Sequence, residues 1–349
     1  MTFAEAIQHS MTLAMQADDS VVCFGLGVDD PRRIFGTTSG LVERFGSRRV
    51  FDTPTSENAV TGVAVGAALG GLRPVMVHQR LDFALLAMDQ LVNSAAKWHY
   101  MFGGQKSVPL TVRLIIGRGW GQGPTHAQSL QAWFNHIPGL KVVMPSTPQD
   151  AGQLLFSSIF DNNPVLFLEH RWLHGTEGEV SDTFDCESLG LAKCLRSGTD
   201  ITLVSMSYMT LEALRAAEVL AEQGISCEIL DVRTVKPLDQ DSIIKSVSKT
   251  GRLLVLDTGA ITGSVAGDII AEVCSSLFDA LKIAPKRLGL PDHPEPTSYG
   301  ITAEFYNTST EILREVCAMM DLELTDPLLA VADSSECHDI PGDWFKGPF

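Results

Sequence analysis

Short apolar runs alternate with longer segments of helical spacing along most of the chain. In the first half, the spacing of apolar positions predicts helices at Phe3–Met15, Ala59–Leu69, Phe83–Tyr100 and Pro148–Phe160. Apolar runs of strand length occur at Val21–Leu26, Val50–Phe51, Val75–His78, Pro109–Ile116, Val142–Met144 and Val165–Glu169. This alternation predicts an α/β fold in which helices cover both faces of a parallel sheet.

A polar segment over residues 174–188 separates this block from a second alternating block. The second block predicts strands at Ile201–Ser205, Ser226–Leu230 and Leu253–Asp257, and helices at Leu211–Gln223 and Ser264–Phe278. Beyond residue 322 the periodicity fades, and the end of the chain is rich in Pro, Gly and aromatic residues. We therefore predict a first α/β domain over residues 1–185, a second over 186–322, and an extended tail over 323–349.

Composition and charge narrow the possible partners. The chain has 349 residues, of which 45% are hydrophobic and 19% charged, an ordinary balance for a globular protein. Its net charge of −16 argues against a nucleic-acid or anionic-membrane partner. Neither a signal peptide nor a membrane span is recognisable, so we predict a cytoplasmic protein. The seven cysteines are scattered singly, which favours reduced thiols over disulfides or a structural zinc site.

Two glycine-rich stretches are only weak evidence for a dinucleotide-binding or anion-binding site. Phe24-Gly25-Leu26-Gly27 resembles the start of a dinucleotide fingerprint, but Asp30 stands where the third glycine belongs. Asp29 and Asp30 would also repel a pyrophosphate, so a dinucleotide site is disfavoured. The stretch over residues 117–123 could cradle an anion or form a flexible loop.

Polar residues gather where several predicted strands end. They are Glu57, the run His78-Gln79-Arg80 with Asp82, Arg118 and His126. In an open parallel sheet, ligands bind beyond the carboxyl ends of the strands. Taken alone, Glu57 could simply complement the dipole of a helix N-terminus. The residue pattern therefore leaves the structural and the functional interpretation equally open.

Longer segments resemble a known family. They are FDTPTSENAVTGVAVGAALGGLRPV, MDQLVNSAAKWHYMFGGQKSVPLTVR, THAQSLQAWFNHIPGLKVVMPSTPQDA and DNNPVLFLEH, and the likeness extends from about residue 3 to about residue 320. These segments are similar to the β subunit of the thiamine-diphosphate-dependent 2-oxo acid dehydrogenase E1 component, of pyruvate, branched-chain or acetoin type. The resemblance implies a pyrimidine-binding domain of the thiamine-diphosphate fold, followed by a transketolase C-terminal-like α/β domain.

The resemblance also implies roles for individual residues. Glu57 matches the family acid that hydrogen-bonds N1′ of the cofactor aminopyrimidine and favours the tautomer that takes the thiazolium C2 proton. Phe83 matches an aromatic residue that packs on the pyrimidine, and Gln79 is expected beside it on the cofactor side. His126 matches a histidine that lines the active-site channel and assists acyl transfer to a lipoyl arm.

A departure from the family concerns the substrate. The run His78–Asp82 replaces a segment that is mostly apolar in the family, and a neighbouring loop adds Arg118. Guanidinium groups bind phosphate and carboxylate bidentately, so His78, Arg80 and Arg118 are expected to contact a substrate with an additional anionic group. The alternative is that Arg80 pairs within the protein, with Asp82 or Asp89.

The resemblance further implies ions and partner proteins. A potassium site is expected at Asp161 and Asn163, with the backbone of Leu110 and Ser158; a simple Asx turn is the alternative. The family holds Mg²⁺ and the diphosphate through a GDG…N motif of an α subunit. No GDG occurs in this chain, so an α₂β₂ heterotetramer is expected.

Three functions remain open at this stage. The leading one is decarboxylation of a small-molecule 2-oxo acid, with acyl transfer to a lipoyl-bearing acyltransferase. The second is transketolase-like or carboligating chemistry on an anionic substrate without a lipoyl partner. The third is a non-catalytic scaffold, which the presence of Glu57, Phe83 and His126 disfavours.

Overall fold

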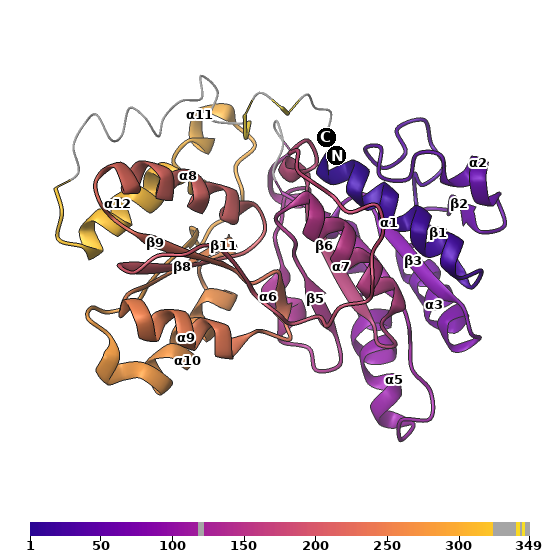
Figure 1. The fold of residues 1–349 in the computed structure, drawn as a ribbon. Coiled ribbons are helices and arrows are strands. Elements are labelled where there is room, and N and C mark those ends of the chain that lie inside the picture. The colour runs from indigo at the N-terminus through magenta and orange to yellow at the C-terminus, as the bar shows by residue number, and fades with distance from the viewer. Residues whose placement is uncertain (118–121, 324–339, 343, 346–349) are drawn as a thin grey trace. The chain divides into compact units, whose positions relative to one another are not determined.

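The computed structural model of the chain describes residues 1–117, 122–323, 340–342, 344 and 345. These residues form two compact units, each with its own sheet (Figure 1). The first unit takes the described residues within 1–118 and 125–189, and the second takes those within 119–124 and 190–349. Both units alternate strands with helices, so the α/β prediction is confirmed for each.

The sheet of the first unit consists of parallel, deeply buried strands. In spatial order, its strands are β5 (Lys141–Val143), β6 (Val165–His170), β4 (Thr111–Ile116), β3 (Arg73–His78), β1 (Val21–Phe24) and β2 (Val50–Phe51). Every position of β1, β4 and β6 is buried, as expected for a parallel sheet that is covered on both faces. The carboxyl ends of these strands share one edge of the sheet, where the polar residues follow.

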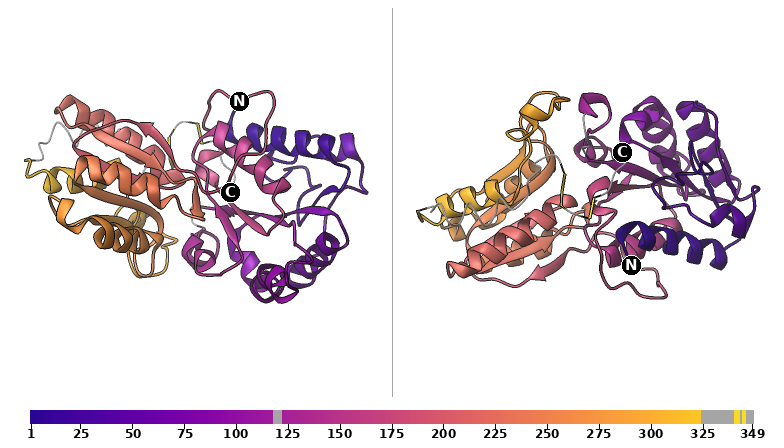
Figure 2. Two further views of the ribbon diagram at one scale, coloured as in Figure 1. Left: turned by 60° about the horizontal axis from the view of Figure 1, so that its bottom comes forward. Right: turned by 90° about the horizontal axis from the view of Figure 1, so that it is seen from above.

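Helices cover this sheet on its two sides. The helices α1 (Phe3–Ala17) and α7 (Pro148–Phe160) pack against each other, and α3 (Glu57–Leu69) packs on β3 from the opposite side (Figure 2). The remaining elements before residue 190 are short. They are α2 (Leu41–Phe45), α4 (Leu81–Ala84), η1 (Leu85–Ala87), η2 (Gln90–Ala95), α5 (Ala96–Met101), η3 (Gly123–Thr125), α6 (Gln131–Asn135) and η4 (Arg171–Leu173).

The second unit is a smaller sheet between two pairs of helices. Its strand order is β12 (Lys286–Leu290), β11 (Leu253–Ala260), β8 (Ile201–Ser205), β9 (Cys227–Asp231) and β7 (Lys193–Arg196), and only the β7–β9 pair is antiparallel among them. The pair α8 (Tyr208–Glu222) and α12 (Ser309–Met319) covers one face, and the pair α9 (Gln240–Thr250) and α10 (Val265–Leu277) covers the other (Figure 1). The short elements are β10 (Thr234–Lys236), η5 (Phe278–Ala280) and α11 (Tyr299–Thr302).

The predicted elements differ from the observed ones in two instructive places. The predicted helix Phe83–Tyr100 is a succession of short segments, α4, η1, η2 and α5, and η2 has the hydrogen bonding of a π-helix. The predicted strand Val21–Leu26 ends at Phe24, because Gly25 and Gly27 turn the chain with φ of 153° and 84°. Both corrections fall beside the candidate site described below.

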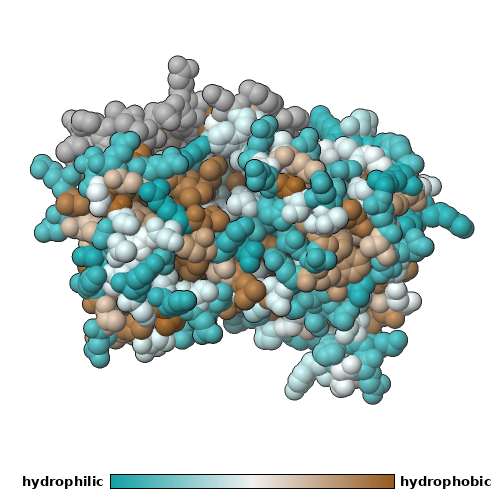
Figure 3. All heavy atoms as spheres, in the orientation of Figure 1, coloured by the Kyte–Doolittle hydropathy of each residue, from teal (hydrophilic) through white to brown (hydrophobic). Residues whose placement is uncertain are grey.

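The surface is mixed in polarity. In each unit, the face in Figure 3 carries mostly hydrophilic side chains, with smaller apolar areas scattered among these side chains. Among the described residues, no helix is long and apolar enough to cross a membrane. The six described cysteines are free thiols, in agreement with their scattered positions. Arg118, Cys337 and most of the predicted tail over 323–349 lie outside the described residues.

Candidate active site

Glu57 is the first residue of α3, directly after a turn that is tied to the loop following β1. The Asp52 carboxylate accepts hydrogen bonds from the backbone N–H of Gly27 (2.7 Å) and of Thr53 (2.9 Å). These bonds hold the segment before α3 against the β1 loop, as Asx turns do. Ser56 occupies the N-cap of α3 but makes no side-chain capping bond. The Glu57 side chain, half-buried, is therefore placed by the loop rather than by a helix cap.

A small open pocket lies in front of Glu57. Its walls are mostly apolar, and its polar side chains carry a carboxyl, an imidazole, an amide and a hydroxyl group. The lining residues are Leu26, Thr53, Pro54, Glu57, Val60, Met76, Val77, His78, Gln79 and Phe83, all from the first unit. A slot with apolar walls and a few convergent polar groups suits a flat heteroaromatic ring. The pocket thus brings together Glu57, His78, Gln79 and Phe83, which the sequence singled out separately.

Two glycines of the β1 loop allow this pocket to form. A Cβ on Gly25 would lie 2.1 Å from the carbonyl oxygen of Val77, and one on Gly27 would lie 2.0 Å from Nε2 of Gln79. The Phe24–Gly27 stretch therefore needs glycines for the close approach of its loop to β3. This packing role explains the glycines without a bound dinucleotide.

His78 lines the pocket and has a buried ring nitrogen. The residue ends β3 and is 5% exposed, and its Nε2 has no hydrogen-bond partner among the described residues. Burial lowers the pKa of His78 to about 4, so the imidazole is neutral at physiological pH. A neutral imidazole can donate or accept a hydrogen bond, depending on which nitrogen carries the proton.

His126 lies next to the pocket through its contact with Phe83. The two rings meet edge to face, with centroids 5.5 Å apart and an angle of 88° between their planes. The segment that carries His126 is tied to α4, because Nε2 of Gln128 donates to the Asp82 carboxylate (2.7 Å). The His126 side chain is exposed, and its Nδ1 lies 3.0 Å from the Thr125 hydroxyl. This arrangement suits a residue at the mouth of the pocket.

The predicted substrate residues are only partly described. Arg80 is buried, and its Nη1 donates to the carbonyl oxygen of Gly117 (3.0 Å). Of its two suggested acidic partners, Asp82 accepts from Gln128, and Asp89 accepts from Asn93 (2.7 Å). Arg118 lies outside the described residues.

The sequence analysis overlooked two residues at the same sheet edge. His170 ends β6, and Arg171 begins the turn η4 immediately after it; both are buried. The Arg171 guanidinium lies 4.5 Å from the ring centre of Phe35. The sequence could have indicated both residues, because a histidine and an arginine stand at the end of the apolar run that forms β6.

The residues expected to bind potassium lie together, and each of them also contacts other protein groups. Lys141 pairs with the Asp161 carboxylate, and Arg73 donates to the Asp161 carbonyl oxygen (3.1 Å). The Ser158 carbonyl oxygen accepts from the Thr111 hydroxyl (3.0 Å), and that of Leu110 accepts from a backbone N–H (2.9 Å). Asn163 donates its backbone N–H to Asp161 (2.8 Å), as in an Asx turn. Lys141 and Arg73 thus place two cationic side chains beside Asp161, and the potassium site stays a prediction.

Both units of the chain match known protein families in sequence. Residues 1–175 match the transketolase pyrimidine binding domain, and residues 190–312 match the transketolase C-terminal domain. The solved structure described as "Split gene transketolase, inactive beta4 tetramer" covers 93% of this chain and 99% of its own length. Its TM-score of 0.75 at 18% identity shows a shared fold.

Similar proteins include named oxidoreductase subunits. The chain is 41% identical to the acetoin:2,6-dichlorophenolindophenol oxidoreductase subunit beta of Cupriavidus necator, over 84% of this chain and 89% of the relative. It is 40% identical to the subunit of that name from Bacillus subtilis, over 90% and 95% of the two chains. It is 38% identical to the pyruvate dehydrogenase E1 component subunit beta of Rickettsia felis, over 90% and 97%. The chain therefore belongs to the transketolase-like family of β subunits of thiamine-diphosphate-dependent 2-oxo acid dehydrogenase E1 components.

Proposed function

We propose that this β subunit takes part in the oxidative decarboxylation of a 2-oxo acid and that Glu57 activates the cofactor. The observation that carries the proposal is the position of Glu57 in a pocket with apolar walls, together with Gln79 and Phe83. A planar aminopyrimidine needs such walls and a hydrogen-bonding group at its ring nitrogen, and the pocket offers both. When bound, thiamine diphosphate supplies the electron sink for decarboxylation of the 2-oxo acid.

We assign the binding and proton-transfer roles to individual residues in and beside the pocket. The Glu57 carboxyl would hold a proton at the pyrimidine ring nitrogen, and Phe83 would pack on the ring. Gln79 and the neutral His78 offer hydrogen bonds at the carboxyl end of β3. We assign His126 the exchange of a proton during acyl transfer to a lipoyl arm, and its ring contact with Phe83 supports this role.

The proposed partners follow from the family to which the chain belongs. We assign Mg²⁺ and the diphosphate to an α subunit with a GDG…N motif, in an α₂β₂ assembly, because the family holds them there and this sequence contains no GDG. A lipoyl-bearing acyltransferase is the proposed acceptor of the acyl group, and a cytoplasmic location remains a prediction.

Replacement of Glu57 tests the mechanism. In the complex with the α subunit, Mg²⁺, thiamine diphosphate and an artificial electron acceptor, Glu57→Gln should lower kcat by about 10²–10⁴-fold, the usual contribution of a positioned acid or base. Glu5→Gln is a matched control, because Glu5 lies in the first turn of α1, in the same unit and outside the pocket lining. Calorimetry should show that both variants still bind the cofactor. Unchanged turnover in Glu57→Gln would refute the proposed role.

A second function is favoured by one observation, the buried Arg80 at the sheet edge. A transketolase-like or carboligating enzyme for an anionic substrate would use the same pocket without a lipoyl protein. Product analysis separates the two functions, because a new carbon–carbon bond without any lipoyl protein supports the second, and acylated lipoyl domain supports the first.

A further inference from the structure

One buried side chain in the pocket wall has no polar partner in the part of the chain that the structure describes. His78 ends β3 and is 5% exposed, and its Nε2 makes no hydrogen bond to a described residue. The two other buried histidines among the described residues differ from it. The His170 Nδ1 accepts the backbone N–H of Trp172 (3.2 Å), and the His174 Nε2 lies 3.5 Å from the Glu169 carboxylate.

A buried nitrogen of this kind costs stability until a ligand pairs with it. Moving a polar group out of water is unfavourable when no new hydrogen bond replaces those made to water. Burial alone lowers the pKa of His78 to about 4, without a contribution from a charged neighbour, so the ring is neutral and no ion pair offsets the cost. An apolar ring of similar size would end β3 without this cost. Ligand binding therefore explains the imidazole better than folding does.

His78 and Glu57 line the same pocket. The apolar side chains of Leu26, Met76 and Phe83 line it with them. The helix α3 begins at Glu57 and packs on β3, which ends at His78, so two elements in direct contact carry the two polar groups. A ring that fills this small pocket would therefore contact both groups.

The other neutral polar residues of the pocket are less buried than His78. Gln79 is only partly buried, and its amide lies against the β1 loop, since a Cβ on Gly27 would be 2.0 Å from its Nε2. Thr53 is also partly buried. Water can reach both of these residues, whereas the buried His78 nitrogen needs a ligand.

An aminopyrimidine carries the groups that this imidazole needs. Besides the ring nitrogen N1′, which we assign to Glu57, it has a second ring nitrogen, N3′, that accepts a hydrogen bond, and an amino group that donates one. A neutral imidazole can donate to the first or accept from the second, according to its tautomer. We propose that His78 is a second hydrogen-bonding residue for the cofactor pyrimidine and contacts N3′ or the amino group. This inference rests on the proposed function, and it assigns His78 to the cofactor instead of to the anionic substrate group expected from the sequence.

Calorimetry of the complete complex of α and β subunits with Mg²⁺ tests this contact. His78→Phe keeps an aromatic ring but removes the nitrogen, so the Kd of thiamine diphosphate should rise about 2- to 13-fold, the change expected for one neutral hydrogen bond. His78→Gln retains a donor and an acceptor and should recover part of the affinity. The control is His99→Phe, which should leave the Kd unchanged, because His99 is exposed, lies on α5 in the same unit and is outside the pocket lining.

Two cofactor analogues identify the atom that His78 contacts. One has a CH group in place of N3′, and the other lacks the amino group. Each analogue should bind the wild type less tightly than the cofactor does. For the analogue that lacks the partner of His78, this loss should be smaller in His78→Phe, by about the factor that the substitution itself costs. An analogue with a CH group in place of N1′ is the control, and its loss should be the same in the wild type and in His78→Phe.

A thermal melt of the complex without cofactor separates binding from folding. His78→Phe should melt at the wild-type temperature or above it, because it removes a buried nitrogen without a partner. The proposal is overturned if His78→Phe melts lower and binds the cofactor as the wild type does, or if every analogue loses the same affinity in both proteins. If the wild-type complex binds no thiamine diphosphate at all, the proposed function fails and this inference falls with it.

Discussion

At the scale of single residues, Lys141 gives the chain a cation of its own where the family resemblance implies potassium. Its ammonium group pairs with Asp161, and Arg73 binds the carbonyl oxygens of Ile159 (3.2 Å) and Asp161 (3.1 Å). A potassium ion needs several oxygen ligands, and a positive side chain nearby weakens its binding. The two side chains therefore link β5, β3 and the end of α7 in the way that an ion would.

Removal of this ammonium group should make the protein respond to potassium. We expect the wild-type melting temperature to be equal in potassium and choline chloride at the same ionic strength. Lys141→Met should melt roughly 2–4 °C lower in choline chloride, the shift for a partly exposed ion pair worth about 1 kcal/mol. Potassium should restore part of the loss, which a thermal melt measures directly. Lys286→Met, which breaks the exposed pair with Glu315, is the control and should show no such recovery.

A potassium effect on the wild-type protein would contradict this expectation. A wild type that gains stability in potassium alone would mean that an ion binds despite Lys141 and Arg73. The sequence could not reveal this arrangement, because Lys141 and Asp161 are 20 positions apart and meet only when β5 pairs with β6.

At the scale of elements, the link between β8 and α8 stores backbone strain. Ser207 has φ 52° and ψ −133°, a conformation that glycine adopts far more easily than other residues. The side chain is fully buried, and its hydroxyl has no hydrogen-bond partner among the described residues. Although Ser207 occupies the N-cap of α8, it makes no capping bond there. Both features cost stability.

Ser207→Gly should therefore stabilise the second unit. It removes the strained Cβ and the buried hydroxyl, and we expect the free energy of unfolding to rise by about 1–2 kcal/mol in urea titrations. Ser207→Ala removes only the hydroxyl, so its gain should be smaller. A loss of stability in Ser207→Gly would contradict this explanation and would point to an important contact of the hydroxyl.

The elements that the sequence predicted well are those with strong local signals. The helix α7 has the predicted bounds Pro148–Phe160, because Thr147 caps it and Pro148 opens it. The segments between Leu81 and Met101 share the apolar spacing of one helix, but spacing does not reveal a π-helical hydrogen-bond pattern. The edge strands β7 and β12 are short and partly exposed, so only their pairing partners define them.

The residues of the candidate site also divide into those with a local sequence signal and those that depend on tertiary packing. Glu57, His78, Gln79 and Phe83 were found because they follow recognisable strands or lie in segments that resemble the family. Arg171 was missed because its proximity to Arg80 depends on the order of strands in the sheet, in which β4 separates β3 from β6. Strand order is a property of tertiary packing, which the pattern of a single sequence does not contain.

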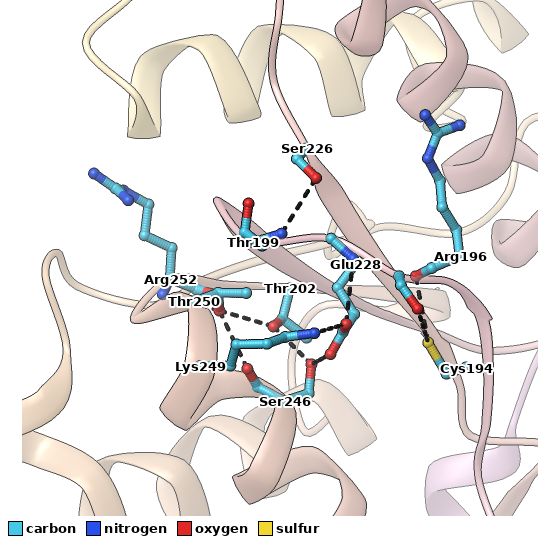
Figure 4. A network of polar contacts seen from close by, with 12 residues as sticks. Cys194, Arg196, Thr199, Thr202, Ser226, Glu228, Ser246, Lys249, Thr250 and Arg252 are labelled. Atoms are coloured by element: carbon cyan, nitrogen blue, oxygen red, sulfur yellow. Dashed lines mark hydrogen bonds and ion pairs between the residues drawn. The ribbon is translucent and has the colours of Figure 1, made fainter.

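At the scale of the whole molecule, acidic side chains outnumber basic ones. One of them, Glu228, stabilises the second unit through a buried polar network. Figure 4 shows its carboxylate in a polar network with Lys249 and Ser246, near Thr202 and Thr250. The Ser246 hydroxyl donates to Glu228 at 2.6 Å. Burial by itself would raise the pKa of Glu228, but the hydrogen bonds from Lys249 and Ser246 outweigh it and lower this pKa.

This lowered pKa makes the network sensitive to acid. A carboxyl group whose pKa is lower in the folded state stabilises the protein above its unfolded pKa, about 4.3, and this contribution disappears as the pH falls through the folded value. We expect Glu228→Gln to be less stable than the wild type at pH 7, and the difference to shrink below about pH 4.3. Urea unfolding of the two proteins across this range measures the effect. A difference that is independent of pH would exclude a role for the ionised carboxylate.

The pocket described above also has a consequence for how the subunit is made. All its walls come from residues between Leu26 and Phe83, and the described residues of the first unit all precede residue 190. Because a chain leaves the ribosome from its N-terminus and its domains fold as units, the unit that contains the pocket can acquire its shape during translation. An α subunit could then meet a preformed surface while the rest of this polypeptide is still being synthesised.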